Sequence, residues 1–200
     1  MRKHGKIVGE PASRYLYPKS RIATLLFFIA NILAPLASAT PLPSDLLVSA
    51  NWLSEHLSDP NLVIIDARSP QEFTLEHVTG ASNIPDNVTF RHRDGYALIS
   101  PISVMRDTFT RAGINDQRYV VVYDGGEYVQ ATRLFWVLEV YGHRSVYILN
   151  GGFPRWIEQN HPTEQKTNSP RDGFFVPSIA GQYLASKIDT RLAIDNPQYA

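Results

Sequence analysis

The sequence predicts an α/β domain in which helices cover both faces of a central parallel sheet. Buried strands are predicted by three short apolar runs bounded by turn residues, at 62–66, 119–123 and 145–149. Their apolarity is continuous rather than alternating, which is typical of parallel strands covered on both faces. Helical segments lie between these runs. Strands that alternate with helices require crossover connections, which place the sheet in the middle of the domain.

Helices are predicted where a capping residue or a proline opens a segment and a glycine closes it. Ser49 can cap the first helix, and Pro101 stands in the first turn of the second. Gly113 and Gly142 close the second and the third. The four predicted helices are 50–57, 100–113, 128–141 and 153–160.

The composition is that of a globular protein, with 44% hydrophobic and 19% charged residues. The absence of Cys from 200 residues excludes disulfides, thiolate metal sites and a cysteine nucleophile. Residues 40–200 hold 13 Lys and Arg against 18 Asp and Glu, a net charge of −5. An acidic body without a basic patch argues against nucleic-acid binding. The sequence implies no cofactor and no metal.

Residues 1–39 have the layout of a secretory signal peptide. A basic stretch precedes a nearly uninterrupted apolar run at 23–36, and a small-residue triplet that ends at Ala39 follows it. The apolar run is shorter than the roughly 20 residues that span a bilayer, which disfavours a permanent anchor. We therefore expect cleavage after Ala39, export to the periplasm or the medium, and no membrane attachment after cleavage.

The sequence divides into a signal peptide at 1–39, a domain at 40–165 and a final segment at 166–200, because 161–171 is polar and aperiodic. A faint internal repeat bears on the final segment. Both 49–61 and 186–198 place a Ser before a short helical stretch that ends in a Pro-containing turn. The repeat predicts that the final segment is a linker and the opening of a truncated second domain. Chance similarity of two short pieces is the alternative.

Two separated motifs carry a family resemblance. The first places Asp66 and Arg68 after a strand and continues with His77-Val-Thr-Gly-Ala. The second ends a strand and opens a helix with Gly151-Gly152-Phe-Pro-Arg-Trp156. In this order and spacing they resemble the signatures of the rhodanese family, the sulfurtransferase fold, except that Glu76 stands where the family usually has Gly. The resemblance implies a rhodanese-like α/β fold.

The resemblance also implies where catalysis would occur. In active family members, the loop after the second buried strand begins with a Cys whose thiolate takes up sulfane sulfur as a persulfide, stabilised by backbone N–H groups and the following helix. Asp124 stands at that position, and a carboxylate cannot carry a sulfane sulfur. No catalytic residue is therefore expected. The degenerate loop consists of Asp124, Gly125, Gly126, Glu127, Tyr128 and Val129.

Asp124 is expected to fold inward and accept those N–H groups itself, as a helix cap does. An Asp nucleophile is disfavoured because no second Asp, metal-binding set or phosphate loop accompanies it. Asp66 and Arg68 follow a strand where ligand sites collect, or they pair with each other. His77 is expected to be structural, and Trp156 to belong to the core. The segment 91–94 is a solvated turn or faces an anionic substrate.

Rhodanese-family enzymes often occur as tandem domains in which the first copy has lost the Cys, commonly to Asp, and the second copy catalyses. The resemblance therefore implies an exported, non-catalytic N-terminal copy of a thiosulfate or 3-mercaptopyruvate type sulfurtransferase. Its implied partner is a second rhodanese domain in the same polypeptide, and a small sulfur-containing anion is a candidate ligand. The alternative is a stand-alone inactive rhodanese module that binds a partner protein or a small anion.

Overall fold

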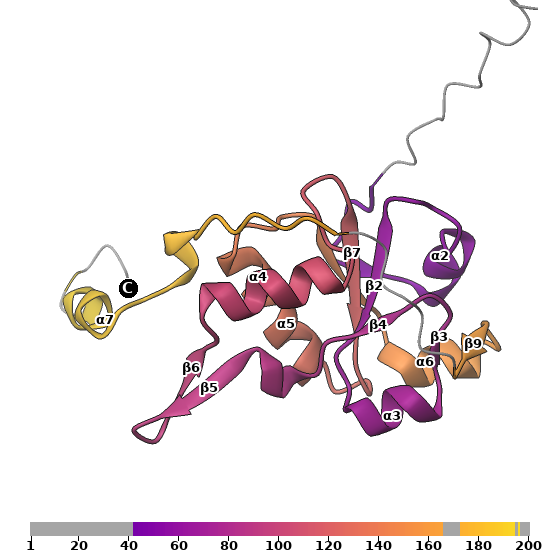
Figure 1. Ribbon diagram of the computed structural model, residues 1–200, viewed down its shortest axis with the longest axis horizontal. Coiled ribbons are helices and arrows are strands. Elements are labelled where there is room, and N and C mark those ends of the chain that lie inside the picture. Colours follow the sequence, from indigo (N-terminus) through magenta and orange to yellow (C-terminus); the bar gives the residue numbers. More distant parts are fainter. Residues whose placement is uncertain (1–41, 166–172, 195, 197–200) are drawn as a thin grey trace, which may run out of the picture. The chain divides into compact units, whose positions relative to one another are not determined.

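A five-stranded parallel sheet forms the centre of the protein, in a computed structural model that describes residues 42–165, 173–194 and 196 (Figure 1). The strand order is β1-β8-β7-β2-β4, and every neighbouring pair is parallel. The strands are β1 (Leu47–Val48), β2 (Leu62–Asp66), β4 (Ser82–Asn83), β7 (Tyr119–Tyr123) and β8 (Val146–Leu149).

Helices cover both faces of this sheet, as the sequence predicted (Figure 1). One core cluster joins alternate residues of β2 and β7 to α4 and α5, which lie to the left of the sheet in Figure 1. The other cluster joins the remaining residues of these strands to α2, α3 and α6. The helices are α2 (Ala50–Glu55), α3 (Pro70–Leu75), α4 (Ile102–Arg111), α5 (Val129–Val140), α6 (Gly152–Glu158) and α7 (Lys187–Ile194).

The connection from β4 to α4 forms a small hairpin that the sequence analysis treated as a turn. A short 3₁₀ helix, η1 (Asp86–Val88), leads into β5 (Phe90–Arg93) and β6 (Tyr96–Ile99), which pair antiparallel. The two turn residues, Asp94 and Gly95, both have positive φ, at 52° and 80°. A turn of this kind matches the right-handed twist of the flanking strands. The hairpin has largely exposed side chains.

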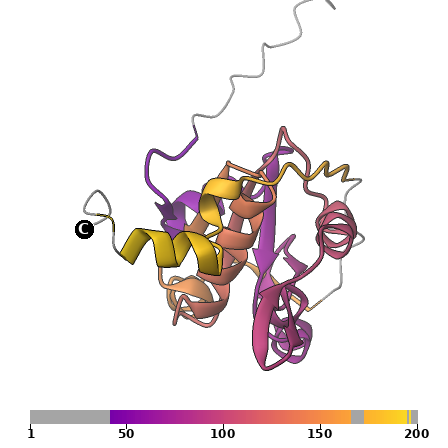
Figure 2. The same ribbon diagram turned by 90° about the vertical axis from the view of Figure 1, so that its left-hand side faces the viewer.

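Residues 173–184 pack on the helices α4 and α5 (Figure 2, yellow). Phe175 is 2% exposed and joins the first core cluster, where its ring meets Phe109 edge-on. Ser178 N donates to the Tyr141 carbonyl at 3.0 Å, and a second 3₁₀ helix, η2 (Gly181–Tyr183), follows. The sequence analysis placed these residues in a linker and did not anticipate that one of them completes the core.

The predicted strands 62–66 and 119–123 are confirmed, and the third begins one residue later than predicted, at Val146. The signal-peptide prediction falls on residues 1–39, which lie outside the described residues. Among the helices of the described residues, none is both long enough and apolar enough to cross a bilayer.

Candidate functional site

Asp124 lies in the loop between β7 and α5, at the carboxyl end of the sheet. Its side chain turns back into the loop, and only 1% of the residue is exposed. The Oδ1 atom accepts hydrogen bonds from the backbone N–H groups of Gly126 at 2.9 Å and Tyr128 at 3.3 Å, and Oδ2 accepts one from Ala131 at 3.1 Å. The carboxylate therefore occupies the anion cradle at the start of α5, as expected from the sequence.

The backbone of this loop explains why its N–H groups converge. Gly126 has a φ of 104° and Tyr128 a φ of 63°, both in the left-handed region. Left-handed residues placed among others turn neighbouring N–H groups towards one point and make an anion-binding concavity. Because α5 begins at the next residue, Val129, the positive end of the helix dipole adds to the same field. The negative charge of Asp124 is stabilised by both.

A second loop, at the end of β8, is joined to the first. The Asp124 carbonyl accepts a hydrogen bond from Phe153 N at 2.9 Å, and the Tyr128 hydroxyl accepts one from Gly151 N at 2.7 Å. Gly152 has a φ of 57°, and a Cβ at this position would lie 2.6 Å from the Asp124 carbonyl oxygen. Only glycine permits this approach. The glycine pair of the second motif thus serves the contact between the two loops.

Asp66 and Arg68 lie at the carboxyl end of the neighbouring strand β2, where they pair with each other. Arg68 Nη2 donates to Asp66 Oδ2 at 2.6 Å, and Nε donates to Oδ1 at 3.0 Å. Tyr123, the last residue of β7, donates its hydroxyl to Asp66 Oδ2 at 2.7 Å. The Arg68 guanidinium lies 3.8 Å from the centre of the Phe153 ring. This buried pair is therefore continuous with the two loops that meet at Asp124.

Burial and pairing set the ionisation of this cluster. Burial raises the pKa of Tyr123 well above its ordinary value, and the Asp66 carboxylate raises it further. Burial alone would lower the pKa of Arg68, but the hydrogen bonds and the attraction to Asp66 outweigh it, so that this pKa is raised. Tyr123 stays neutral and Arg68 stays charged near neutral pH. Neither is poised for proton transfer, and the pair is structural.

His77 and Trp156 take internal roles in the second core cluster and beside it. His77 lies in β3 (His77–Val78), which pairs antiparallel with β9 (Thr163–Glu164). Its Nδ1 is 2.7 Å from the Phe73 carbonyl oxygen, and its ring stacks on the Phe73 ring. Trp156 is wholly buried and donates Nε1 to the Pro162 carbonyl at 3.0 Å. The structure brings neither residue into the hydrogen-bonded loops around Asp124.

Sequence reasoning did not single out three residues that complete these sites: Tyr123, Asn150 and Phe153. Tyr123 ends an apolar strand, and nothing in an apolar run signals that its hydroxyl has a buried carboxylate partner. Asn150 accepts a hydrogen bond from the Tyr128 hydroxyl at 2.9 Å. The one usable signal is position, because parallel strands deliver the residues at their carboxyl ends to the same edge of the sheet.

The loop holds the Asp124 carboxylate as an internal anion. The Asp124 carboxylate is engaged by backbone N–H groups on both oxygens, and it is buried. Among the described residues, no group of three or more His, Asp or Glu side chains is placed to hold a metal ion. What the geometry supports is a loop that keeps the shape of an anion site while its own side chain fills it.

Comparison with known proteins gives a consistent result. Residues 49–159 match the family model for the Rhodanese-like domain. Thiosulfate sulfurtransferase from Gallus gallus is 33% identical in an alignment of 148 residues that covers 66% of this chain and 51% of that protein. The 3-mercaptopyruvate sulfurtransferase of Escherichia coli K12 is 30% identical over 160 residues, 73% of this chain and 56% of that protein.

A solved structure of the Escherichia coli 3-mercaptopyruvate sulfotransferase SseA has a TM-score of 0.69 and 28% identity, and the match covers 75% of this chain and 62% of that one. The chain spans about half the length of the curated relatives that it matches. Its fold and its sequence are similar to those of thiosulfate and 3-mercaptopyruvate sulfurtransferases. The chain belongs to the rhodanese-like domain family.

Proposed function

We propose that this chain is the non-catalytic N-terminal half of an exported two-domain sulfurtransferase of the thiosulfate or 3-mercaptopyruvate type. In this proposal the reactive Cys belongs to a second rhodanese domain further along the same polypeptide. The sulfur donor is a small anion, and it is processed by that second domain. The N-terminal half contributes structure and packing rather than chemistry.

The observation that carries the proposal is the state of the Asp124 loop. A persulfide would have to occupy the place where the Asp124 carboxylate accepts three backbone N–H groups. A carboxylate oxygen cannot bond to sulfane sulfur and release it, so the loop cannot pass sulfur to an acceptor. The surrounding scaffold is nevertheless intact, which supports a domain retained for its structure.

A second rhodanese domain is supported by α7. Ser186 Oγ accepts a hydrogen bond from Asp189 N at 3.1 Å, and Ser49 Oγ accepts one from Trp52 N at 3.1 Å, so that the two halves of the faint repeat begin with the same cap. α7 exposes Ile188 at 70% and Leu192 at 68%. An apolar helix face that is exposed to water is typical of a surface that packs against another domain, and the match covers only 51% of the Gallus gallus relative.

The test is a sulfur-transfer assay on two proteins, the 200-residue chain and the complete polypeptide made in its host. With thiosulfate and cyanide, or with 3-mercaptopyruvate, the 200-residue chain should form product no faster than a protein-free control. The complete polypeptide should be exported, should be larger than 22.5 kDa and should turn over. Replacing the Cys of its additional part with Ser should abolish that turnover.

Two outcomes would reject the proposal. Turnover by the 200-residue chain would show that Asp124 does not prevent sulfur transfer. A host protein of 22.5 kDa or less would mean that no catalytic half is attached. The second outcome would instead favour an exported inactive module, and its partner would be sought among proteins and small anions.

A further inference from the structure

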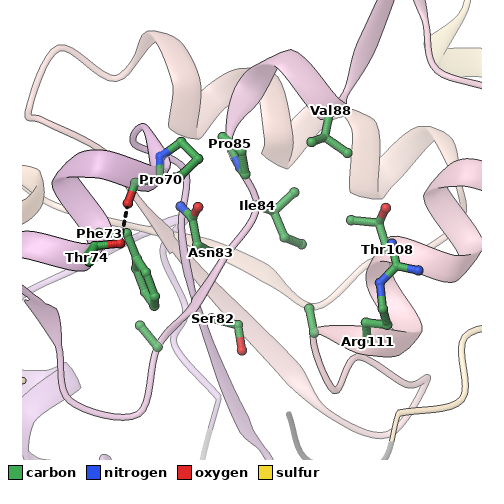
Figure 3. Close-up of a pocket in the computed structure, with 12 residues that line it drawn as sticks. Pro70, Phe73, Thr74, Ser82, Asn83, Ile84, Pro85, Val88, Thr108 and Arg111 are labelled. Carbon is green, nitrogen blue, oxygen red and sulfur yellow. Dashed lines mark hydrogen bonds between the residues drawn. The ribbon is translucent and has the colours of Figure 1, made fainter. Parts of the chain in front are cut away.

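A groove of about 430 Å³ lies between α3 and α4, beside the edge strand β4 (Figure 3). Phe73 of α3 lines one wall, and Thr108 and Arg111 of α4 line the other. Ile84 and Pro85, which follow β4, lie between these walls. The groove has no lining residue in the Asp124 loop or in the loop after β8, so it is separate from the site of the proposed function.

The walls of the groove are apolar and well packed. Phe73 is 7% exposed and Ile84 is 1% exposed, and both belong to packed parts of the domain. Ala81 and Ala112 line it as well, and their small side chains leave space that a larger residue would fill. Cavities of this size, lined mostly by apolar residues, are typical of sites for small organic molecules.

Three polar groups at the groove are unused by the described part of the protein. The Arg111 guanidinium forms no ion pair or hydrogen bond with a described residue. The hydroxyls of Ser82 and Thr108 form no hydrogen bond with a described residue either. Figure 3 shows Arg111 and Thr108 together on the α4 wall. A guanidinium beside the Thr108 hydroxyl (Figure 3) is suited to a carboxylate, which Arg binds through parallel N–H donors.

We propose that this groove binds a small organic carboxylate with an aromatic or branched aliphatic body. The body lies against Phe73 and Ile84, and the carboxylate is held by Arg111 and by one hydrogen bond from the Thr108 hydroxyl. A peptide that adds a strand to the sheet is a poorer fit, because β4 has only two residues and offers a short ladder. The charge of Arg111 and the volume of the groove therefore select a small monoanion.

The experiment uses 3-phenylpropionate as the probe and the 200-residue chain labelled with ¹⁵N. Titration followed by NMR should shift the amide signals of 82–84 and 108–112, with a dissociation constant on the order of 1 mM. The uncharged analogue 3-phenylpropanamide should bind about tenfold more weakly, because it cannot pair with the guanidinium. Shifts confined to other residues, or no shifts with the carboxylate, would overturn the proposal.

Two variants separate the charge from the shape of the groove. R111Q should weaken binding of 3-phenylpropionate about tenfold, whereas R106Q, on the same helix but outside the groove, should bind as the unaltered chain does. T74W, at an exposed position on the α3 wall, should fill the groove and abolish binding without changing the net charge. Equal losses in R111Q and R106Q would mean that the probe responds to general charge, and the site would be rejected.

Discussion

At the scale of single residues, Asp124 supplies the acceptor for three backbone N–H groups that the fold turns towards one point. A buried N–H group without an acceptor costs about 1–3 kcal/mol, so this side chain is a major contributor to the stability of the loop. Its negative charge is also attracted to the positive end of the α5 dipole. Under the proposed function, the residue that replaces the catalytic Cys is thus also one that stabilises the domain.

We predict that D124A lowers the free energy of unfolding by about 3 kcal/mol, because the N–H groups lose their acceptor. Urea unfolding measures this loss. Sulfate at ~0.1 M should recover part of it in D124A and little in the unaltered chain, since an anion can enter the emptied cradle. A loss below about 0.5 kcal/mol would show that the loop satisfies its N–H groups in another way.

The position of Glu127 predicts the effect of placing a Cys nucleophile at position 124. Its carboxylate folds over the loop, so that a Cβ on Gly125 would come within 2.8 Å of Oε2. A nearby negative charge disfavours a thiolate, and D124C alone should therefore show little sulfur transfer. The double variant D124C/E127Q should be about threefold faster in a thiocyanate assay, whereas D124C/E55Q should equal D124C. Full turnover in D124C alone would contradict this.

The burial of His143 predicts that stability depends on pH. It is 3% exposed, and its Nε2 has no hydrogen-bond partner among the described residues. Burial lowers its pKa, although the nearby Asp116 opposes the shift in part. The unfolded chain therefore binds a proton more readily, and stability should fall as the pH drops below about 6.5 towards the lowered value. Between pH 7 and pH 5, the free energy of unfolding should change less in H143F than in the unaltered chain. An equal change in both proteins would show that His143 is not the cause.

At the scale of elements, the segment 173–184 holds the α4 and α5 layer together, and Phe175 is its anchor. Removing its ring from the contact with Phe109 should cost about 3–4 kcal/mol in F175A, as is usual for a large side chain lost from a core. The neighbouring Phe174 is 76% exposed, so F174A should change stability by less than about 0.5 kcal/mol. Thermal or urea unfolding of the two variants compares them directly. A loss of stability in F175A as small as that in F174A would mean that the segment is not part of the folding unit.

The elements that sequence reasoning predicted share one physical property, a continuous or periodic apolar pattern. β2 and β7 were predicted to the residue because buried parallel strands carry apolar side chains on both faces. The four predicted helices end one or two residues later than the observed ones, since their last residues form caps and turns, and α6 begins one residue earlier than predicted. The short helix α3 was not predicted. α2, for example, ends at Glu55 with His56 as its cap.

The elements that were missed lack such a pattern. β3, β4 and β9 have two residues each, which is too short for any period to appear. The hairpin β5–β6 is largely exposed, so its composition resembles a loop, although Asp94-Gly95 is a recognisable hairpin turn. The packing of Phe175 depends on a tertiary contact that no local pattern encodes. At the site, the inward turn of Asp124 was predictable from the loop, but the partners Phe153 and Asn150 were not.

At the scale of the whole molecule, the exposed apolar face of α7 is the feature that a single domain leaves unexplained. In the 200-residue chain, the amides of 187–194 should exchange with solvent within about tenfold of the rate of an unstructured peptide, because this helix buries little surface. In the complete polypeptide of the proposed function they should be protected by about 100-fold or more. Hydrogen exchange with mass spectrometry measures both, and equal exchange would argue against a second domain on α7.

The glycine that follows Gly151 changes what a motif search can decide. Gly152 is needed because its Cα lies against the main chain of the Asp124 loop, and that need is the same whether residue 124 carries sulfur or oxygen. The motif therefore indicates a close contact between two loops and does not indicate whether the loop that begins at residue 124 is reactive. Genome surveys that count sulfurtransferases by such motifs would count scaffolds and enzymes alike. Inspection of the one residue that opens the loop would separate them.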